Sequence, residues 1–278
     1  MSADIEKLRE LIADSWSYRI YGESSGESVD ELVRGIVERT ITDISLPEDI
    51  TSIPVYMFYN CKNLALTSLP SGITFIGNYA FYGCKNLALT SLPSGLTTIG
   101  NHMFYDCSNL ALTSLPSGIT SIGNYAFDGC SNLALTSLPS GLNSIGANAF
   151  YGCTKLALTS LPSGLTNIEK YAFYGCTNLA LTSLPSGIST IPISVFFNCT
   201  NLAIKSIPSG VKSIEPRAFQ SCTSLRELTF QGTPSTINSD SFYNCSNLKT
   251  INVPWSEGAV ANAPWGATNA TINYDYVP

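Results

Sequence analysis

The sequence predicts an α/β solenoid of about nine right-handed coils, each with short strands and a helical turn, because three features repeat every 23 residues. All nine cysteines are 23 residues apart. A phenylalanine precedes each cysteine by three residues. The letters LALTSLPSG occur six times, beginning at residues 64, 87, 110, 133, 156 and 179. A fixed period of this size is typical of arrays whose units are stable only between their neighbours.

The centre of each unit places Phe, Cys and Leu at positions i, i+3 and i+6. Residues at this spacing share one face of a helical turn, so we expect that face to point inward. In two of the units this core ladder consists of Phe81, Cys84, Leu87, Phe104, Cys107 and Leu110. One unit is too small to bury such a face alone, and stacked units bury it together.

The rest of a unit predicts two extended segments joined by a turn. An extended piece over 112–115 meets Pro116, which cannot donate to a strand ladder, and residues 117–118 supply a Ser-Gly turn. Ile119 and Ile122 then form a second apolar pair. Each coil is therefore expected to run strand, turn, second extended segment and helical turn.

The segment LPSGITSIGNYAFDGCSNL, residues 115–133, resembles the BspA-like leucine-rich repeats, whose unit reads I-G-x-x-A-F-x-x-C-x-x-L with Pro after the main strand. The resemblance extends over residues 42 to 254 and implies a leucine-rich-repeat solenoid with a ligand-binding or adhesion surface. The ends of the chain resemble, more loosely, prophage-encoded proteins of intestinal bacteria, which combine a short helical start with an APWGATNATINY ending.

One leucine column departs from that family spacing. Later repeats place apolar residues at Leu225, Leu228 and Phe230, whereas the central repeats have Leu110, Leu112 and Leu115. Strict alternation would put two of these three on opposite faces. Either a bulge turns both inward, or an exposed column binds a ligand. The column consists of Leu66, Leu89, Leu112, Leu135, Leu158 and Leu181.

The two ends of the chain lack the repeat. Residues 1–41 are expected to form an N-terminal helical cap or an attachment element, because apolar residues follow a helical stripe from Ile5 to Trp16 and Ser28 and Glu31 form a capping box. Residues 255–278 are expected to form a C-terminal cap to the solenoid over 42–254. The start, MSADIEKLRE, does not resemble a cleaved secretion signal.

Composition argues against several function classes. The net charge is −6 and only 12% of residues are charged, so neither nucleic acid nor membrane insertion is expected. His102 is the only histidine and is interpreted as a surface substitution, which leaves no multi-histidine centre. The cysteines are expected to be free, buried and reduced. We therefore predict a protein that is not an enzyme and has no cofactor and no metal site.

Tyrosine is the informative residue for binding. Ten of the fourteen tyrosines fall at two positions of the repeat, three residues apart and offset from the core ladder. A column of phenol rings would suit sugars or proteins, because tyrosine supplies contact area and a hydroxyl. The alternative is that the rings only pack on one another, and the small polar strand face around Ala65, Thr67 and Ser68 is a further candidate. The predicted ligand-binding edge is Tyr59, Tyr82, Tyr105, Tyr151 and Tyr174.

These observations favour a phage or prophage tail-associated receptor-binding protein that recognises a bacterial surface component and contacts other tail proteins through residues 1–41. Its expected location is the virion tail after cytoplasmic assembly. The alternatives are a bacterial cell-surface adhesin of BspA type that binds a host protein or glycan, and an intracellular or engineered scaffold.

Overall fold

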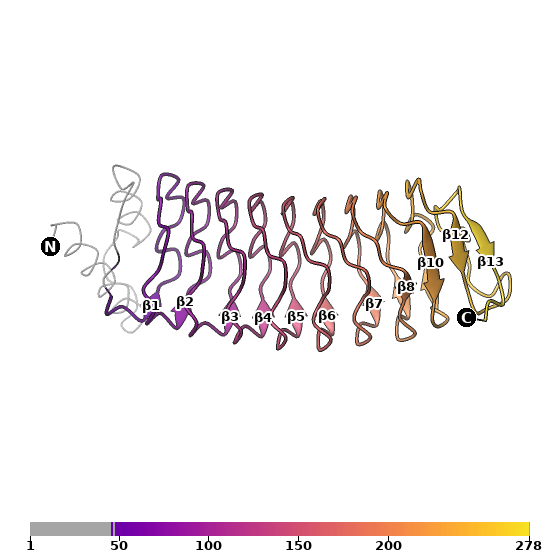
Figure 1. Ribbon diagram of the computed structural model, residues 1–278, viewed down its shortest axis with the longest axis horizontal. Helices are drawn as coiled ribbons and strands as arrows, with labels where there is room; N and C mark the ends of the chain where they lie inside the picture. The colour runs from indigo at the N-terminus through magenta and orange to yellow at the C-terminus, as the bar shows by residue number, and fades with distance from the viewer. Residues whose placement is uncertain (1–45, 47, 278) are drawn as a thin grey trace, which may run out of the picture.

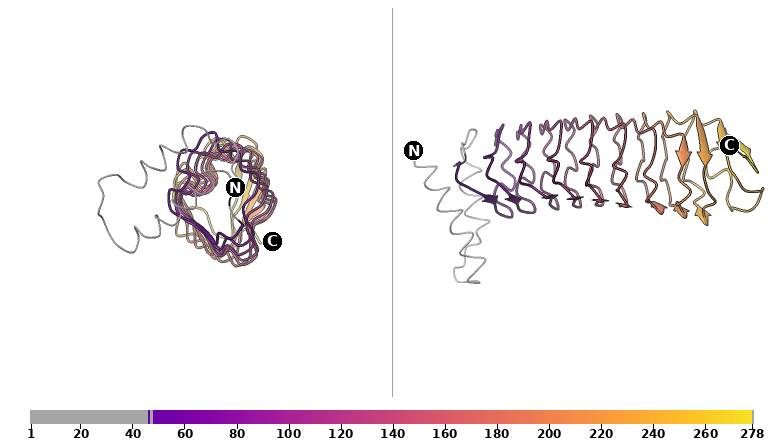
Figure 2. Two further views of the ribbon diagram at one scale, coloured as in Figure 1. Left: turned by 90° about the vertical axis from the view of Figure 1, so that its left-hand side faces the viewer. Right: turned by 60° about the horizontal axis from the view of Figure 1, so that its bottom comes forward.

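A computed structural model describes residues 46 and 48–277. The chain winds into a rod of stacked coils (Figure 1), and the end-on view shows that successive coils follow the same outline (Figure 2). The described part contains strands and turns but no helix. The strands are β1 Ser52–Ile53, β2 Phe75–Ile76, β3 Thr98–Ile99, β4 Ser121–Ile122, β5 Ser144–Ile145, β6 Asn167–Ile168, β7 Thr190–Ile191, β8 Ser206–Ile207, β9 Ser213–Ile214, β10 Glu227–Phe230, β11 Thr236–Ile237, β12 Thr250–Asn252 and β13 Thr271–Asn273.

The strands form parallel sheets along the rod. Their orders are β1-β2, β3-β4-β5-β6, β7-β9-β11 and β8-β10-β12-β13. Pairing joins equivalent residues of adjacent coils, as with Ser121 and Ser144 or Ile122 and Ile145 in β4 and β5. The sequence period is therefore the structural period, and β13 adds a turn beyond the nine cysteine-containing units.

The predicted helical turn is wrong. Two residues of that segment have left-handed backbone, Tyr125 with φ 55° and Gly129 with φ 75°, which interrupts a right-handed helix. Alternate amides also donate to the next coil, from Phe127 to the Ala149 carbonyl at 2.8 Å, instead of back along the chain. The segment is a run of turns, and the inward face of Phe, Cys and Leu arises from the turns.

The main strand is also absent from the central coils. Residues 112–115 form no strand. Next to them, a hydrogen bond connects this coil to the preceding one, from the Ala111 amide to the Leu89 carbonyl at 3.3 Å. Two residues separate the inward leucines there, so the alternation that a ladder needs is lost. Where Leu228 and Phe230 restore it, the four-residue strand β10 forms.

The core is a set of ladders along the rod. The phenylalanine rings stack from Phe58 to Phe242 with centroids 5.2 to 5.7 Å apart. All nine cysteines are free and buried. Each thiol from the second unit on donates to a phenylalanine carbonyl of the preceding coil, as Cys130 does to Phe104 at 3.0 Å. The expectation of free, buried cysteines is confirmed.

The described C-terminal segment packs on the last coils. Trp255 and Trp265 are buried, and their rings lie 5.2 and 6.2 Å from the ring of Phe230. Beyond them, β13 pairs with β12. That residues 255–278 act as a cap stays a prediction, and residues 1–41 lie outside the described part of the chain.

Candidate functional site: the aromatic edge

Two columns of aromatic residues run along one edge of the rod, and together we call them the aromatic edge. The first column occupies the repeat position of Tyr56, Tyr79, His102, Tyr125, Asn148, Tyr171, Ser194, Arg217 and Asp240. The second occupies the position of Tyr59, Tyr82, Tyr105, Asp128, Tyr151, Tyr174, Phe197, Gln220 and Tyr243. Three of the predicted tyrosines lie before the acidic position Asp128 and two after it.

Backbone turns hold the first column in place. Each of its members from Tyr56 to Arg217 has a positive φ, between 49° and 61°. The left-handed region costs a residue with a Cβ about 1–2 kcal/mol. Stacking of an aromatic pair contributes about 0.5–1.5 kcal/mol beyond burial, which offsets a similar amount. Asn148, Ser194 and Arg217 adopt the same backbone without a ring, and amides at this position donate to the next coil, as Asn148 does to the Lys170 carbonyl at 3.1 Å, so the turns do not depend on ring stacking.

The rings of both columns stack face to face over much of their length. In the second column the centroids of Tyr59 and Tyr82 are 4.7 Å apart, and those of Tyr82 and Tyr105 are 4.5 Å apart. Stacking resumes with Tyr151 and Tyr174 at 4.5 Å. A stacked ring offers a ligand its edge and hydroxyl, because its neighbours cover its faces. Packing of the rings on one another is thus present, and binding by them stays a prediction.

His102 belongs to this stack and is not an isolated surface substitution. Its ring lies between those of Tyr79 and Tyr125, with centroids 4.5 and 4.6 Å away. Burial lowers the pKa of His102, and its Nδ1 atom is buried without a hydrogen-bond partner. The imidazole therefore serves as a neutral ring that continues the column.

Each column has a gap in its stack. Asn148 stands in the first column between Tyr125 and Tyr171, and no ring covers the faces that these tyrosines turn toward it. A groove of about 560 Å³ opens here. Its lining includes Tyr125, Asn148, Tyr151, Tyr171, Tyr174 and Phe197, with Lys170 adding positive charge and Arg217 paired with Asp240. The groove is the place on the edge where ring faces and polar side chains meet.

Asp128 makes the gap in the second column. Burial, and then the charge of Asp106, raise the pKa of Asp128 to about 7. Burial and the charge of Asp128 also raise the pKa of Tyr105. Asp106 itself has a cation, because its carboxylate lies 3.1 Å from Lys85 Nζ. Asp128 is a partly buried carboxylate that its surroundings do not neutralise.

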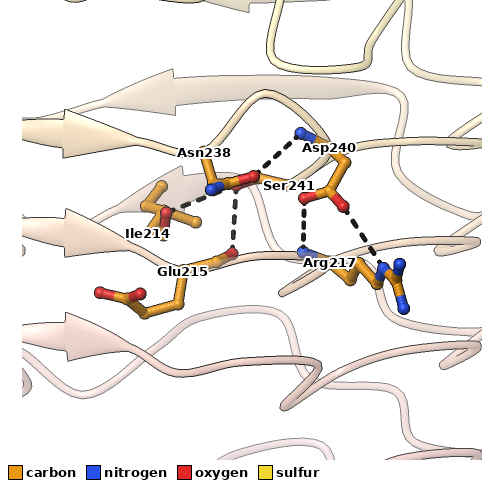
Figure 3. A network of polar contacts seen from close by, with 6 residues as sticks. All are labelled: Ile214, Glu215, Arg217, Asn238, Asp240 and Ser241. Atoms are coloured by element: carbon orange, nitrogen blue, oxygen red, sulfur yellow. Dashed lines mark hydrogen bonds and ion pairs between the residues drawn. The ribbon is translucent and has the colours of Figure 1, made fainter.

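Asp240 is a second acidic residue of the aromatic edge and, unlike Asp128, it has partners within the chain (Figure 3). The Asp240 carboxylate accepts hydrogen bonds from the Arg217 amide at 3.0 Å and from Arg217 Nε at 3.3 Å. The Asp240 amide donates to Asn238 Oδ1 at 3.4 Å, and the neighbouring Ser241 hydroxyl donates to the Glu215 carbonyl at 3.2 Å. At this end of the aromatic edge the carboxylate therefore already has a cation and hydrogen-bond donors from the chain itself.

The leucine column does not face a ligand. Its members, Leu66, Leu89, Leu112, Leu135, Leu158 and Leu181, are 0 to 6% exposed. Of the two alternatives, burial is correct, although no strand is present to carry a bulge. The strand-face candidates Thr67 and Ser68 are exposed, as are their equivalents in the next five units.

Sequence reasoning missed Asp128, Asn148 and Phe197 as members of the aromatic edge. The signal was present, because each occupies a tyrosine position of the repeat. Within residues 46 and 48–277, no group of three or more His, Cys, Asp or Glu side chains is placed to hold a metal ion. The same residues include no helix that is long and apolar enough to cross a membrane.

Several known proteins are similar to this chain. A leucine-rich repeat protein from Bacteroides ovatus is 25% identical with a TM-score of 0.57, over 81% of this chain and 65% of its own length. A leucine-rich repeat protein of T. pallidum is 30% identical with a TM-score of 0.47, over 65% of this chain and 76% of its own. A leucine-rich cell surface protein from Faecalibacterium prausnitzii is 24% identical with a TM-score of 0.43, over 77% of this chain and 79% of its own.

No curated protein sequence matches the chain. The family model described as BspA type leucine rich repeat region, in 6 copies, matches residues 37–157 and 143–262. These two matches overlap and together include most of the sequence and all nine cysteines. The chain belongs to the BspA type leucine-rich repeat family.

Proposed function

We propose that the protein is a non-catalytic binding protein of adhesion type, which recognises a protein or glycan of a cell surface through its aromatic edge. The observation that carries the proposal is the groove around Asn148, where the faces of Tyr125 and Tyr171 are not covered by other rings. Open aromatic faces beside amide and charged groups are what sugars and protein side chains bind.

The narrower proposal is a phage or prophage tail-associated receptor-binding protein, located in the virion. It is supported by the resemblance of the two flanks to prophage-encoded proteins, and it assigns residues 1–41 to attachment within the tail. Affinity purification of the native chain should then recover tail or baseplate proteins. Recovery of cell-envelope proteins instead would favour a bacterial cell-surface adhesin, and recovery of cytoplasmic proteins would favour a scaffold.

The binding proposal is tested with labelled protein on cells of the host or target bacterium. The double change Tyr171→Ala and Tyr174→Ala removes two rings of the groove, and we expect at least a 10-fold loss of binding, because stacked aromatic contacts are worth about 1 kcal/mol each and desolvated ones more. Tyr243→Ala is the matched control, since this ring is 56% exposed at the far end of the second column. Equal loss in both variants, or in neither, would refute the groove as the site.

A further inference from the structure

The second column is interrupted once between Tyr59 and Phe197, at Asp128. Tyr105 and Tyr151 stand one coil before and one coil after this residue, and each is stacked on its other face, by Tyr82 and by Tyr174, at 4.5 Å. Aspartate is much shorter than tyrosine, so the space beyond its carboxylate lies between two ring faces on which no other ring stacks. The Tyr125 ring, from the same coil as Asp128, lies 6.5 Å from that of Tyr105 and is tilted by 53°, so it stands beside this space without stacking on Tyr105. We call this space, bounded by Tyr105, Asp128 and Tyr151, the Asp128 slot.

The width of the slot selects a flat group. Two coil spacings of 4.5 Å place the rings of Tyr105 and Tyr151 about 9 Å apart. A planar group in contact with both rings requires about 7–8 Å, since non-bonded carbon atoms approach to about 3.5–4 Å. One layer of planar atoms therefore fills the slot, and two layers do not fit.

The charge of the slot selects a cation. Within the described residues the Asp128 carboxylate has no hydrogen bond and no ion pair. The charged and titratable groups around it are Asp106, which forms an exposed ion pair with Lys85, and a set of neutral groups, and no cation of the described part of the chain contacts the carboxylate. The neutral groups are Tyr82, Tyr105, Tyr151 and the buried thiols of Cys130 and Cys153. A partly buried carboxylate is stabilised by a cation that also donates hydrogen bonds.

We propose that the Asp128 slot binds the guanidinium group of an arginine side chain on a partner protein. A guanidinium is planar, stacks on aromatic faces and presents a fork of N–H donors that matches a carboxylate. A lysine ammonium is compact and fills the slot less well, and a neutral sugar leaves the carboxylate without a cation. The inference rests on the proposed binding function and narrows the ligand to a protein.

The chain contains its own example of such a pair. At the other end of the aromatic edge, Arg217 of one coil donates through Nε and its amide to Asp240 of the next coil. There the protein supplies the arginine itself, whereas at Asp128 the adjacent coils offer Tyr105 and Tyr151 at the same position. An arginine of a partner protein would give Asp128 the same kind of ion pair that Arg217 gives Asp240.

The test uses the full chain and three capped glycine-flanked pentapeptides whose central residue is arginine, lysine or citrulline, the last being flat but uncharged. Binding is followed by isothermal titration and by NMR of the tyrosine rings. We expect a weak interaction for the arginine peptide, at least 5-fold weaker binding for lysine and no measurable binding for citrulline. Asp128→Asn should reduce arginine-peptide affinity by about 10-fold or more, since a hydrogen bond to a charged group is worth about 1.5–3 kcal/mol.

Asp275→Asn is the matched control, because that carboxylate lies outside the aromatic edge and already accepts a hydrogen bond from the Ser256 hydroxyl at 2.7 Å. It should bind the arginine peptide as the unchanged protein does. Equal affinity for the arginine and citrulline peptides, or arginine binding that survives Asp128→Asn, would overturn the proposal. Cell binding that fails while the peptide result holds would refute the proposed function and leave the slot intact.

Discussion

The uncompensated carboxylate of Asp128 should make the folded protein less stable as the pH rises. Burial raises its pKa from the ordinary 3.8 to about 7, so the folded state holds the proton more tightly than the unfolded state does. By linkage, stability is then lost as the pH increases from about 4 to about 7 and stays low above that. Asp128→Asn removes this titration, and we expect the variant to be more stable than the unchanged protein at alkaline pH.

The expected difference in unfolding free energy between the two proteins follows from the pKa shift of Asp128. One pKa unit corresponds to about 1.4 kcal/mol, so the whole shift would give about 4 kcal/mol if the carboxyl were fully buried. Solvent reaches part of this side chain and screens its charge, which reduces the effect to about 1–2 kcal/mol. Near pH 4 the two proteins should differ little, because the carboxyl is then largely protonated in the folded state and the amide resembles it.

The assay is urea unfolding of both proteins from about pH 4 to about pH 8, followed by circular dichroism and by tyrosine and tryptophan fluorescence. Agreement of the probes establishes whether the array unfolds in one step, which repeat arrays do not always do. Groups that do not interact with Asp128 titrate equally in the two proteins and cancel in the difference. A difference in unfolding free energy that is constant with pH, or that favours the unchanged protein above pH 7, would refute the reasoning about Asp128.

Three further predictions concern the coil itself, and they are checked by thermal and urea unfolding or by thiol labelling. Gly123→Ala places a Cβ 2.8 Å from the Asn101 amide nitrogen, so a loss of about 1–3 kcal/mol is expected, whereas Gly141→Ala, with no atom within 4 Å, should be neutral or slightly stabilising. Phe127→Ala removes one ring of the core stack, and a loss of about 3–5 kcal/mol is expected; a smaller loss than Gly123→Ala gives would mean that the stack contributes little. Burial raises the pKa of thiols such as Cys130, so the nine cysteines should react with a disulfide reagent only after urea is added, and rapid labelling of the native protein would contradict their burial.

The sequence was sufficient to predict the solenoid, its period and the inward ladder of phenylalanine, cysteine and leucine. It could not reveal that the turn is not helical, because spacing by three fits both a helix and a run of turns that share an inward face. Left-handed backbone at positions such as Tyr125 and Gly129 distinguishes the two. The Gly, Asn and Asp residues that recur at the position of Gly129 were a signal for it, whereas tyrosine is uncommon in this conformation and gave none.

The candidate site, too, was only partly predictable from the sequence. The tyrosine columns follow from the period, whereas their binding capacity depends on which ring faces are covered. That depends on the substitutions at Asp128 and Asn148, which look unremarkable in a list of polar residues. The effect of these two substitutions becomes evident from the structure, because adjacent rings lie 4.5 Å apart and one missing ring therefore leaves a space of defined width.

The near-identity of the central coils has a consequence for how such a rod can vary. Adjacent units that contain LALTSLPSG make the same contacts along the rod. The hydrogen bonds from the Ala111 amide to the Leu89 carbonyl and from the Ala134 amide to the Leu112 carbonyl are an example. A block of 23 residues could therefore be gained or lost there without a new kind of contact. Each such event would move the groove relative to the chain's ends by one coil, about 5 Å, so that reach could change in fixed steps while the binding chemistry is retained.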